Sequence, residues 1–449
     1  MDRFNITIIL LLNLIKLILF LYLYKKSNKN IYFNLILYFT TINILLYGVL
    51  VNIIRLLSNS KILKDYGVLT IDLLNVEIIE FISAILFMII LYFSFQLKFW
   101  KNIHIPLVQN KQKLAVLAIF NIISILNNFV SDANNYLLFG ETIKYISGPS
   151  AILLTFFSLK YKQYKFLPFS LANLFLIIFL VFSTGVRGPI LGIILIIVYL
   201  FITNYSIKSL TKIIPIILLP IFLVIFFNNE YSKIKFAFAS EYISNPKAYQ
   251  SITDIGGFII DFYKNGSNQL IEGSDSNVLD EIEFRLGARS MYSVGFLRFT
   301  ERNGFVLAKP LINTLFVFFP RSIFNQNKPY PDSYDGEIYG MGMYVCANEI
   351  DGQVNMTDFY SSCHYYWQFG FLGMLFFTLI SSLYPILIAL ITFKLDIIYK
   401  LFFILVALKP YYFIPQFTIS DIILMLFTKV IPLLIFFYFI QFFQKLKFK

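Results

Sequence analysis

The sequence predicts an all-α polytopic integral membrane protein with about eleven transmembrane helices and one large extracytoplasmic loop. Three observations lead to this fold class. Of the 449 residues, 58% are hydrophobic and 14% are charged, and the mean hydropathy is +0.73. Apolar runs of about 20 residues, enough for a helix to cross a bilayer, recur along the chain. Lysines gather in every second connection between these runs.

The spans follow one another along the chain, each an apolar run between polar connections. The first run is too long for the apolar core of a signal peptide and has no small-residue cleavage site, so we interpret it as a retained span. The predicted spans are residues 4–24, 31–54, 76–97, 114–130, 143–159, 166–183, 189–205, 213–227, 367–393, 399–414 and 422–443.

The charges in the connections predict the orientation. One set of connections is basic and contains a single acid, Asp396; its lysines are Lys25, Lys26, Lys29, Lys98, Lys101, Lys111, Lys113, Lys160, Lys162, Lys165, Lys208, Lys212, Lys394, Lys400, Lys445, Lys447 and Lys449. The other set is acidic and holds Asp65, Asp72, Glu77, Glu80, Asp132, Glu141 and Asp421. The positive-inside rule therefore places the N-terminus outside and the C-terminus in the cytoplasm. The net charge of +12 is then mainly a topology signal and does not indicate nucleic-acid binding.

This register divides the chain into three parts. Residues 1–227 form an N-terminal membrane bundle of about eight spans, and residues 367–449 form a C-terminal bundle of about three. Residues 228–366 form the outer loop, in which short helices are expected, and loops of that length are usually functional. An apolar segment at 311–319 is either a buried helix of this loop or an element that re-enters the membrane.

The residues that support metal or covalent chemistry are scarce. Cys346 and Cys363 both fall in the outer loop, where a disulfide is possible, but two cysteines are not a disulfide framework. His104 and His364 fall on opposite sides of the membrane, and the sequence has no DxD, HExxH, GxSxG, Walker A or dinucleotide-binding motif. An enzyme of this sequence is therefore expected to work without a metal or cofactor.

Cations at the outer face are the main candidates for binding. Arg187 interrupts a long apolar stretch beside Gly185 and Pro189. An arginine in such a place either faces a protein interior or water, which marks a site, or reaches the membrane surface from a turn. Arg285 and Arg289 are four residues apart and share one face of a helix, where guanidinium groups suit phosphate oxygens. The alternative for this pair is a solvent-exposed, ion-paired helix.

Two further candidates follow in the chain. Arg321 and Lys328 lie in proline-bearing turns after the apolar segment, either to bind phosphate or to snorkel at the membrane surface. His364 stands directly before the ninth span, either as a general base for a hydroxyl or as part of an aromatic belt with the residues that follow it.

The order of these motifs resembles the Wzy-type O-antigen or oligosaccharide repeat-unit polymerases. The resemblance rests on STGVRGP at 183–189 between two middle spans, FPRSIFNQNKP at 319–329 near the end of the outer loop, and FGFLG at 369–373 opening the next span. It implies a GT-C-like fold in the bacterial cytoplasmic membrane and a metal-independent glycosyltransferase. Such polymerases join repeat units carried on undecaprenyl diphosphate at the outer face, in O-antigen, capsule or exopolysaccharide synthesis, alongside a chain-length regulator protein.

The resemblance also implies roles for the candidate residues. Arg187, Arg285, Arg289, Arg321 and Lys328 would bind the diphosphate. His364 is expected to activate the acceptor hydroxyl, although Tyr365 follows it where the related ligases have asparagine; an outer acid such as Asp332 or Asp335 is the alternative. Separately from the resemblance, Tyr330, Tyr334 and Tyr339 either contact sugars, together with these two acids, or pack the loop.

Two other functions remain open from the sequence. One is an O-antigen ligase, which passes a finished glycan to another acceptor. The other is a flippase of the same lipid-linked sugars, for which charged residues inside spans are typical. Lys16 and Lys429 are the main cations inside the predicted spans, and either could line the bundle or reach an interface.

Overall fold

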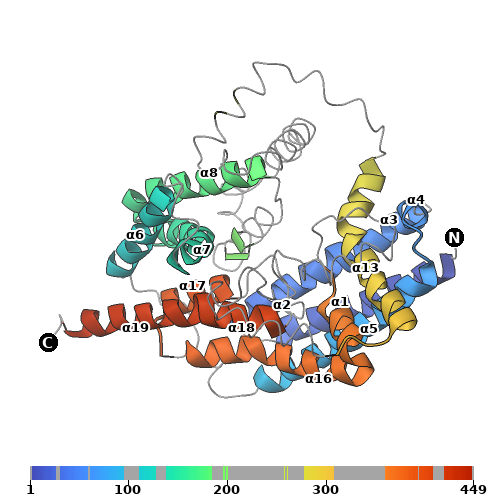
Figure 1. Cartoon of the computed structure of the whole chain (residues 1–449). Helices are drawn as coiled ribbons and strands as arrows, with labels where there is room; N and C mark the ends of the chain where they lie inside the picture. Colours follow the sequence, from blue (N-terminus) through green and yellow to red (C-terminus); the bar gives the residue numbers. More distant parts are fainter. Residues whose placement is uncertain are drawn as a thin grey trace, which may run out of the picture. The chain divides into compact units, whose positions relative to one another are not determined.

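A computed structural model describes most of the predicted bundle and one helix of the predicted outer loop (Figure 1). The described residues are 3–26, 31–58, 61–95, 111–127, 138–184, 196–197, 199–200, 257, 260, 278–307, 359–392, 394–407 and 419–446. Within them the chain is all helical, as the sequence predicts.

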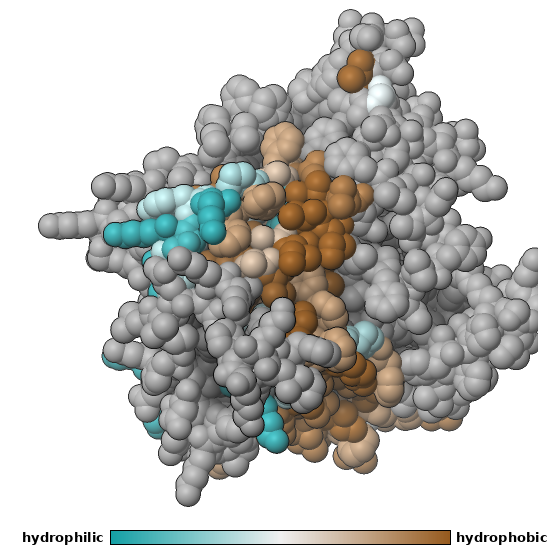
Figure 2. All heavy atoms as spheres, turned by 90° about the vertical axis from the view of Figure 1, so that its left-hand side faces the viewer, coloured by the Kyte–Doolittle hydropathy of each residue, from teal (hydrophilic) through white to brown (hydrophobic). Residues whose placement is uncertain are grey.

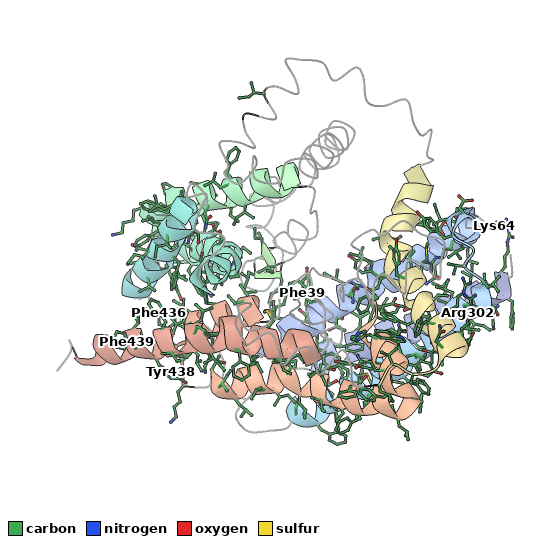
Figure 3. All side chains as sticks on the ribbon, in the orientation of Figure 1. Phe39, Lys64, Arg302, Phe436, Tyr438 and Phe439 are labelled. Atoms are coloured by element: carbon green, nitrogen blue, oxygen red, sulfur yellow. The ribbon has the colours of Figure 1, made fainter. Side chains whose placement is uncertain are left out.

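Four helices are long and apolar enough to cross a membrane: Arg3–Lys26, Asn34–Ser58, Thr70–Ser94 and Ser361–Ile391. Shorter apolar helices cover Leu114–Leu126, Ile146–Lys160, Tyr164–Ile177 and Ile431–Ile440. Side chains exposed to the surroundings include many large apolar ones, such as Phe436 and Phe439, which are 44% and 61% exposed and are labelled in Figure 3. Brown, hydrophobic side chains also form a broad area on the face in Figure 2. Exposed apolar surface of this extent is typical of a protein that lies in lipid.

The chain forms two compact units. The first contains Met1–His104, Asp275–Leu395 and Tyr412–Lys449, and the second contains Ile105–Ser274 and Asp396–Tyr411. The helices of the first unit are α1 (Arg3–Lys26), α2 (Ile31–Asn43), η1 (Ile44–Leu50), α3 (Val51–Ser58), α4 (Lys61–Asp65), α5 (Thr70–Phe95), α13 (Val278–Asn303), α16 (Ser361–Ile391), α18 (Ile419–Met425), η9 (Leu426–Val430) and α19 (Ile431–Leu446).

The second unit is built around α6 (Lys111–Asn127), α7 (Leu138–Lys160), η4 (Tyr164–Phe166), α8 (Leu167–Thr184) and α17 (Ile397–Ala407). Its helices are joined by buried amide and hydroxyl groups as well as by apolar packing. The Asn173 amide donates to Asn121 Oδ1 at 2.8 Å, and Ser147 Oγ donates to Asn173 Oδ1 at 2.9 Å. Phe120 of α6 stacks on Phe402 of α17, with ring centroids 5.6 Å apart.

The second span is a continuous helical stretch that changes its winding at η1, a π-helical segment. Such segments are rare and frequently occur at functional sites. Gly48 lies in η1 directly against the Asn13 side chain of α1, and a Cβ at this position would overlap that amide. The close approach of α1 and η1 therefore requires glycine here.

Helix α13 lies within the predicted outer loop and packs against α3, α5 and α16. Figure 1 shows it in yellow beside the blue α3. A nearly continuous run from Gly287 to Leu297 is buried. This burial brings α13 into the core of the first unit.

Two predicted span starts lie six residues later than the observed helix starts, for one physical reason. Helix α5 begins at Thr70 and α16 begins at Ser361, each six residues before the predicted start. Hydropathy ends a span where polar residues begin, but the polar side chains here find partners inside the protein. Asp72 in the added part of α5 pairs with Arg298, and His364 in the added part of α16 is buried.

Helix α16 is broken at Gly370, whose φ of 71° and ψ of −161° are not helical. The chain that follows α13 occupies the break. Val306 N donates to Trp367 O at 3.2 Å and Leu307 N donates to Gln368 O at 2.8 Å, so carbonyls that lose helical partners are satisfied. The end of α13 is thereby joined to the first two turns of α16.

Candidate functional site

Six charged side chains are buried among the described residues, and all six belong to the first unit. We call them the buried charge network: Lys16, Arg55, Glu77, Glu80, Glu283 and Arg289. Three are cations and three are carboxylates, so the formal charges balance. Burying a charge is costly unless it is paired and hydrogen-bonded. Ionisable side chains in candidate spans are therefore candidates for function by default.

Glu77 of α5 joins three helices. Lys16 Nζ of α1 lies 3.6 Å from Glu77 Oε2, and Asn13 Nδ2 donates to the same oxygen at 3.2 Å. Tyr360, directly before α16, donates its hydroxyl to Glu77 Oε1 at 3.2 Å. Burial raises the pKa of the Tyr360 hydroxyl well above its usual value, and the Glu77 and Glu80 carboxylates add to this effect. Tyr360 is therefore a proton donor to Glu77.

Glu80 lies one turn further along α5 and bonds to the first turn of α16. Ser362 Oγ donates to Glu80 Oε2 at 2.6 Å. The charges of Lys16 and Arg289 also act on this carboxylate. Glu80 therefore connects α5 with the first turn of α16.

Arg55 of α3 joins the network to α13. Its Nη2 donates to Gly287 O at 3.3 Å and to Ser290 Oγ at 3.1 Å, and its Nη1 donates to Asn52 Oδ1 at 3.2 Å. Arg55 Nε lies 3.7 Å from Glu283 Oε1, with both side chains fully buried. Gly287 and Ser290 lie within one turn of Arg289 on α13, Glu283 lies nearer the start of α13, and Asn52 belongs to α3 itself.

Arg289 presents its guanidinium to the α2–η1 junction. Nη1 donates to Asn43 Oδ1 at 3.1 Å, and the guanidinium carbon lies 4.6 Å from the centroid of the Tyr47 ring. The Arg289 side chain is 4% exposed. The amide and the aromatic ring keep the guanidinium in place, and the buried Glu80 carboxylate interacts with its charge.

The backbone of Arg289 is also tied to the start of α16. Ser293 Oγ donates to Arg289 O at 2.8 Å, and the backbone N–H of Tyr360 donates to Ser293 Oγ at 2.8 Å. The structure therefore brings Arg289 and the helix that carries His364 to one interface.

His364 is 1% exposed and lies among aromatic rings. Its ring stacks on Phe359 at 5.4 Å and meets Phe296 of α13 at 5.5 Å and Trp367 at 5.4 Å. The Gln368 side-chain amide lies 3.2 Å from His364 Nδ1. These contacts hold the imidazole in a defined orientation.

The structure settles part of the sequence-based site. The interpretation of the α13 arginines as a solvent-exposed, ion-paired helix is wrong for Arg289, which is buried, and Glu283 on the same helix is fully buried. Arg285 lies one turn before Arg289 in α13. The other predicted site residues fall outside the described residues: Arg187, Arg321, Lys328, Tyr330, Asp332, Tyr334, Asp335 and Tyr339.

Sequence reasoning missed Arg55 and Glu283, and it assigned Glu77 and Glu80 only to orientation. The sequence did contain one signal for the buried pair. Lys16 interrupts the first apolar run, and Glu77 and Glu80 stand near the start of the third. Charges inside neighbouring spans tend to pair with one another. Lys16 lines the bundle, which decides between the two positions considered for it.

The described residues contain no group of three or more histidine, cysteine or acidic side chains arranged to hold a metal. Cys363 is a free, fully buried thiol, and Cys346 lies outside the described part of the chain. Comparisons with protein-family models, curated proteins and solved structures gave no match.

Proposed function

We propose that this chain is a polytopic protein of the bacterial cytoplasmic membrane that polymerises undecaprenyl-diphosphate-linked oligosaccharide units at the outer face. The single observation that supports this most is the environment of Arg289. A buried guanidinium of α13 is held by the Asn43 amide and the Tyr47 ring, and the same helix contacts His364 through Phe296. A diphosphate oxygen is a stronger acceptor than the Asn43 amide and would replace it.

The proposed reaction forms one glycosidic bond. A sugar hydroxyl oxygen of the acceptor unit attacks the anomeric carbon of the donor glycan, and the bond between that carbon and the lipid diphosphate oxygen breaks. The diphosphate leaves with the bonding electrons, and its growing charge is stabilised by guanidinium groups in a site of low dielectric constant. The hydroxyl proton passes to a base, for which His364 and the outer acids Asp332 and Asp335 are the candidates. The reaction needs no metal ion.

The remaining roles rest on the sequence. Arg187, Arg285, Arg321 and Lys328 are proposed to share the diphosphate with Arg289. The tyrosines Tyr330, Tyr334 and Tyr339 are proposed to contact sugars. The predicted orientation, the eleven spans and the GT-C-like architecture belong to the same proposal.

Substitution of Arg289 in the native host tests the proposal. We expect Arg289→Ala to reduce the surface glycan to single repeat units, while Arg289→Lys retains short ladders because the charge remains and the planar fork is lost. Arg302→Ala is the matched control, since Arg302 is on the same helix but exposed. Glycan of normal ladder length from correctly inserted Arg289→Ala protein would contradict the role of Arg289.

A flippase of lipid-linked sugars is the second candidate, favoured by the buried ion pair of Lys16 and Glu77 between two candidate spans. Pairs of this kind occur along transport pathways. Loss of a flippase leaves lipid-linked units on the cytoplasmic side, whereas loss of a polymerase leaves single units at the surface. Loss of a ligase leaves long polymer on its lipid carrier. The location and length of the glycan in a deletion strain separates the three functions.

A further inference from the structure

Arg55 makes contacts that centre on the turn of α13 carrying Arg289. Its two acceptors on α13 are Gly287 O and Ser290 Oγ, two residues before and one residue after Arg289. Its charge is balanced by Glu283, whose other oxygen accepts from Ser58 Oγ at 3.0 Å. Arg55 is fully buried. Its guanidinium therefore acts inside the protein, on α13.

One helical stretch supplies both the contacts of the Arg289 guanidinium and Arg55, which bonds to α13 on either side of Arg289. Asn43 and Tyr47 contact the Arg289 guanidinium, and Arg55 follows them in the continuous helix through η1 and α3. A slip of α13 by one residue would move Arg289 by about 1.5 Å along the helix and by about 100° around it. Such a slip would take the guanidinium away from Asn43 and Tyr47. The bonds from Arg55 oppose this movement.

Gly287 makes the close approach possible. A Cβ at this position would lie 2.5 Å from Arg55 Nη2 and 3.2 Å from Val51 Cγ2. The Gly287 carbonyl accepts from Arg55 and also from Ser290 Oγ, which lies at 2.9 Å. A side chain larger than hydrogen would therefore push Arg55 off its acceptors.

We propose that Arg55 is a positioning residue that fixes Arg289 in the orientation needed to bind the lipid diphosphate, with Gly287 and Ser290 as its docking points on α13. This inference rests on the proposed function. Lysine cannot replace Arg55, because the guanidinium places Nη2 on α13, Nη1 on Asn52 and Nε near Glu283, whereas an ammonium has a single nitrogen. Arg55 does not contact the substrate and acts only through the position of Arg289.

The test measures binding of undecaprenyl diphosphate to the purified full-length protein in detergent micelles. Arg289→Ala is expected to weaken binding about tenfold or more, as for loss of a charged hydrogen bond. Arg55→Lys and Gly287→Ala are expected to weaken it about tenfold, and Ser290→Ala, which removes one acceptor, by a few-fold. The double variant Arg55→Lys/Arg289→Ala is expected to bind no more weakly than Arg289→Ala alone, because Arg55 acts through Arg289.

Two control variants account for the general effects of the substitutions. Gly148→Ala adds a methyl group in α7, where nothing lies within 4 Å of the new Cβ. Ser150→Ala removes a buried hydroxyl from α7 that donates to Ser147 O at 2.9 Å. Both should bind the probe as the unmodified protein does. Thermal unfolding identifies any variant that fails to fold. If Arg55→Lys or Gly287→Ala does not fold, the affinity of Ser290→Ala, the mildest change, decides whether Arg55 positions Arg289.

The outcomes separate the inference from the proposed function. Normal binding by folded Arg289→Ala protein would overturn the proposed function and the inference with it. Weak binding by Arg289→Ala with normal binding by both Arg55→Lys and Ser290→Ala would overturn the inference alone. A double variant that loses affinity by the product of the two single effects would also overturn it, since Arg55 would then act independently of Arg289.

Discussion

The hydroxyl of Tyr360 donates to Oε1 of Glu77 at 3.2 Å across 283 residues of sequence. The bond joins the start of α16 to a carboxylate of α5 that also contacts α1. Tyr360 also carries the backbone N–H that donates to Ser293 of α13. One residue therefore connects the buried charge network with the interface at which Arg289 and the His364-bearing helix meet.

Tyr360→Phe is expected to lower the free energy of unfolding by about 1–3 kcal/mol, because Glu77 stays buried and loses one of its donors. Thermal or chemical unfolding of the purified protein measures the change. Tyr164→Phe serves as the control, since Tyr164 is 58% exposed and its hydroxyl can bond to water. Equal stabilities for Tyr360→Phe and the control would show that the bond to Glu77 contributes nothing.

Lys16→Met is expected to destabilise the protein by about 3–5 kcal/mol, because it leaves the Glu77 carboxylate buried without its cation. The double variant Lys16→Met/Glu77→Gln removes both charges and should recover part of the loss. The comparison requires the two single variants and the double variant measured under one set of conditions. Additive losses in the double variant would mean that the 3.6 Å approach of Lys16 to Glu77 is not an energetic coupling.

Gly370→Ala is expected to cost about 1–3 kcal/mol or more, because φ of 71° is disfavoured for L-residues and the new Cβ would lie 2.9 Å from the Phe305 ring. Gly304→Ala is a matched control: Gly304 has φ of 77°, but nothing lies within 4 Å of its Cβ position. The difference between the two variants measures the contact with Phe305 together with the cost of ψ −161° at Gly370, a region that glycine alone commonly adopts. Similar losses of unfolding free energy would indicate that backbone conformation alone accounts for the cost.

Hydropathy was sufficient to predict the helices that are uniformly apolar. The first span was expected at 4–24 and the helix is Arg3–Lys26, because apolar residues continue almost to both of its ends. The start of α5 was placed too late because Asp72, in the first turn of the helix, is polar but pairs with Arg298 of α13 at 2.7 Å. A sequence pattern treats such a charge as the end of a span.

The site was less accessible to sequence reasoning, because its contacts are long-range. Arg289 was singled out as a candidate from its spacing, and the structure shows that it is buried. The Arg55–Gly287 bond, in contrast, joins residues 232 positions apart and leaves no periodic signal. Arg55 stands at the end of a predicted span, where a lysine or arginine is ordinarily interpreted as an interfacial anchor. Only the packing of α13 against α3 shows that Arg55 is an interior residue.

His364→Phe separates the chemical role of His364 from its packing role. A phenyl ring can keep the stacking on Phe359 and Phe296, so the variant is expected to fold and insert normally. If the imidazole takes the acceptor proton, polymerisation should fall by about 10²-fold or more, leaving single repeat units on the surface glycan.

Gln368→Leu is the companion change, because it removes the amide that lies 3.2 Å from His364 Nδ1. A smaller loss of polymerisation is expected, since only the orientation of the His364 ring is affected. Ladders of normal length in His364→Phe cells would exclude His364 as the base and leave Asp332 and Asp335 as the carboxylates to substitute next.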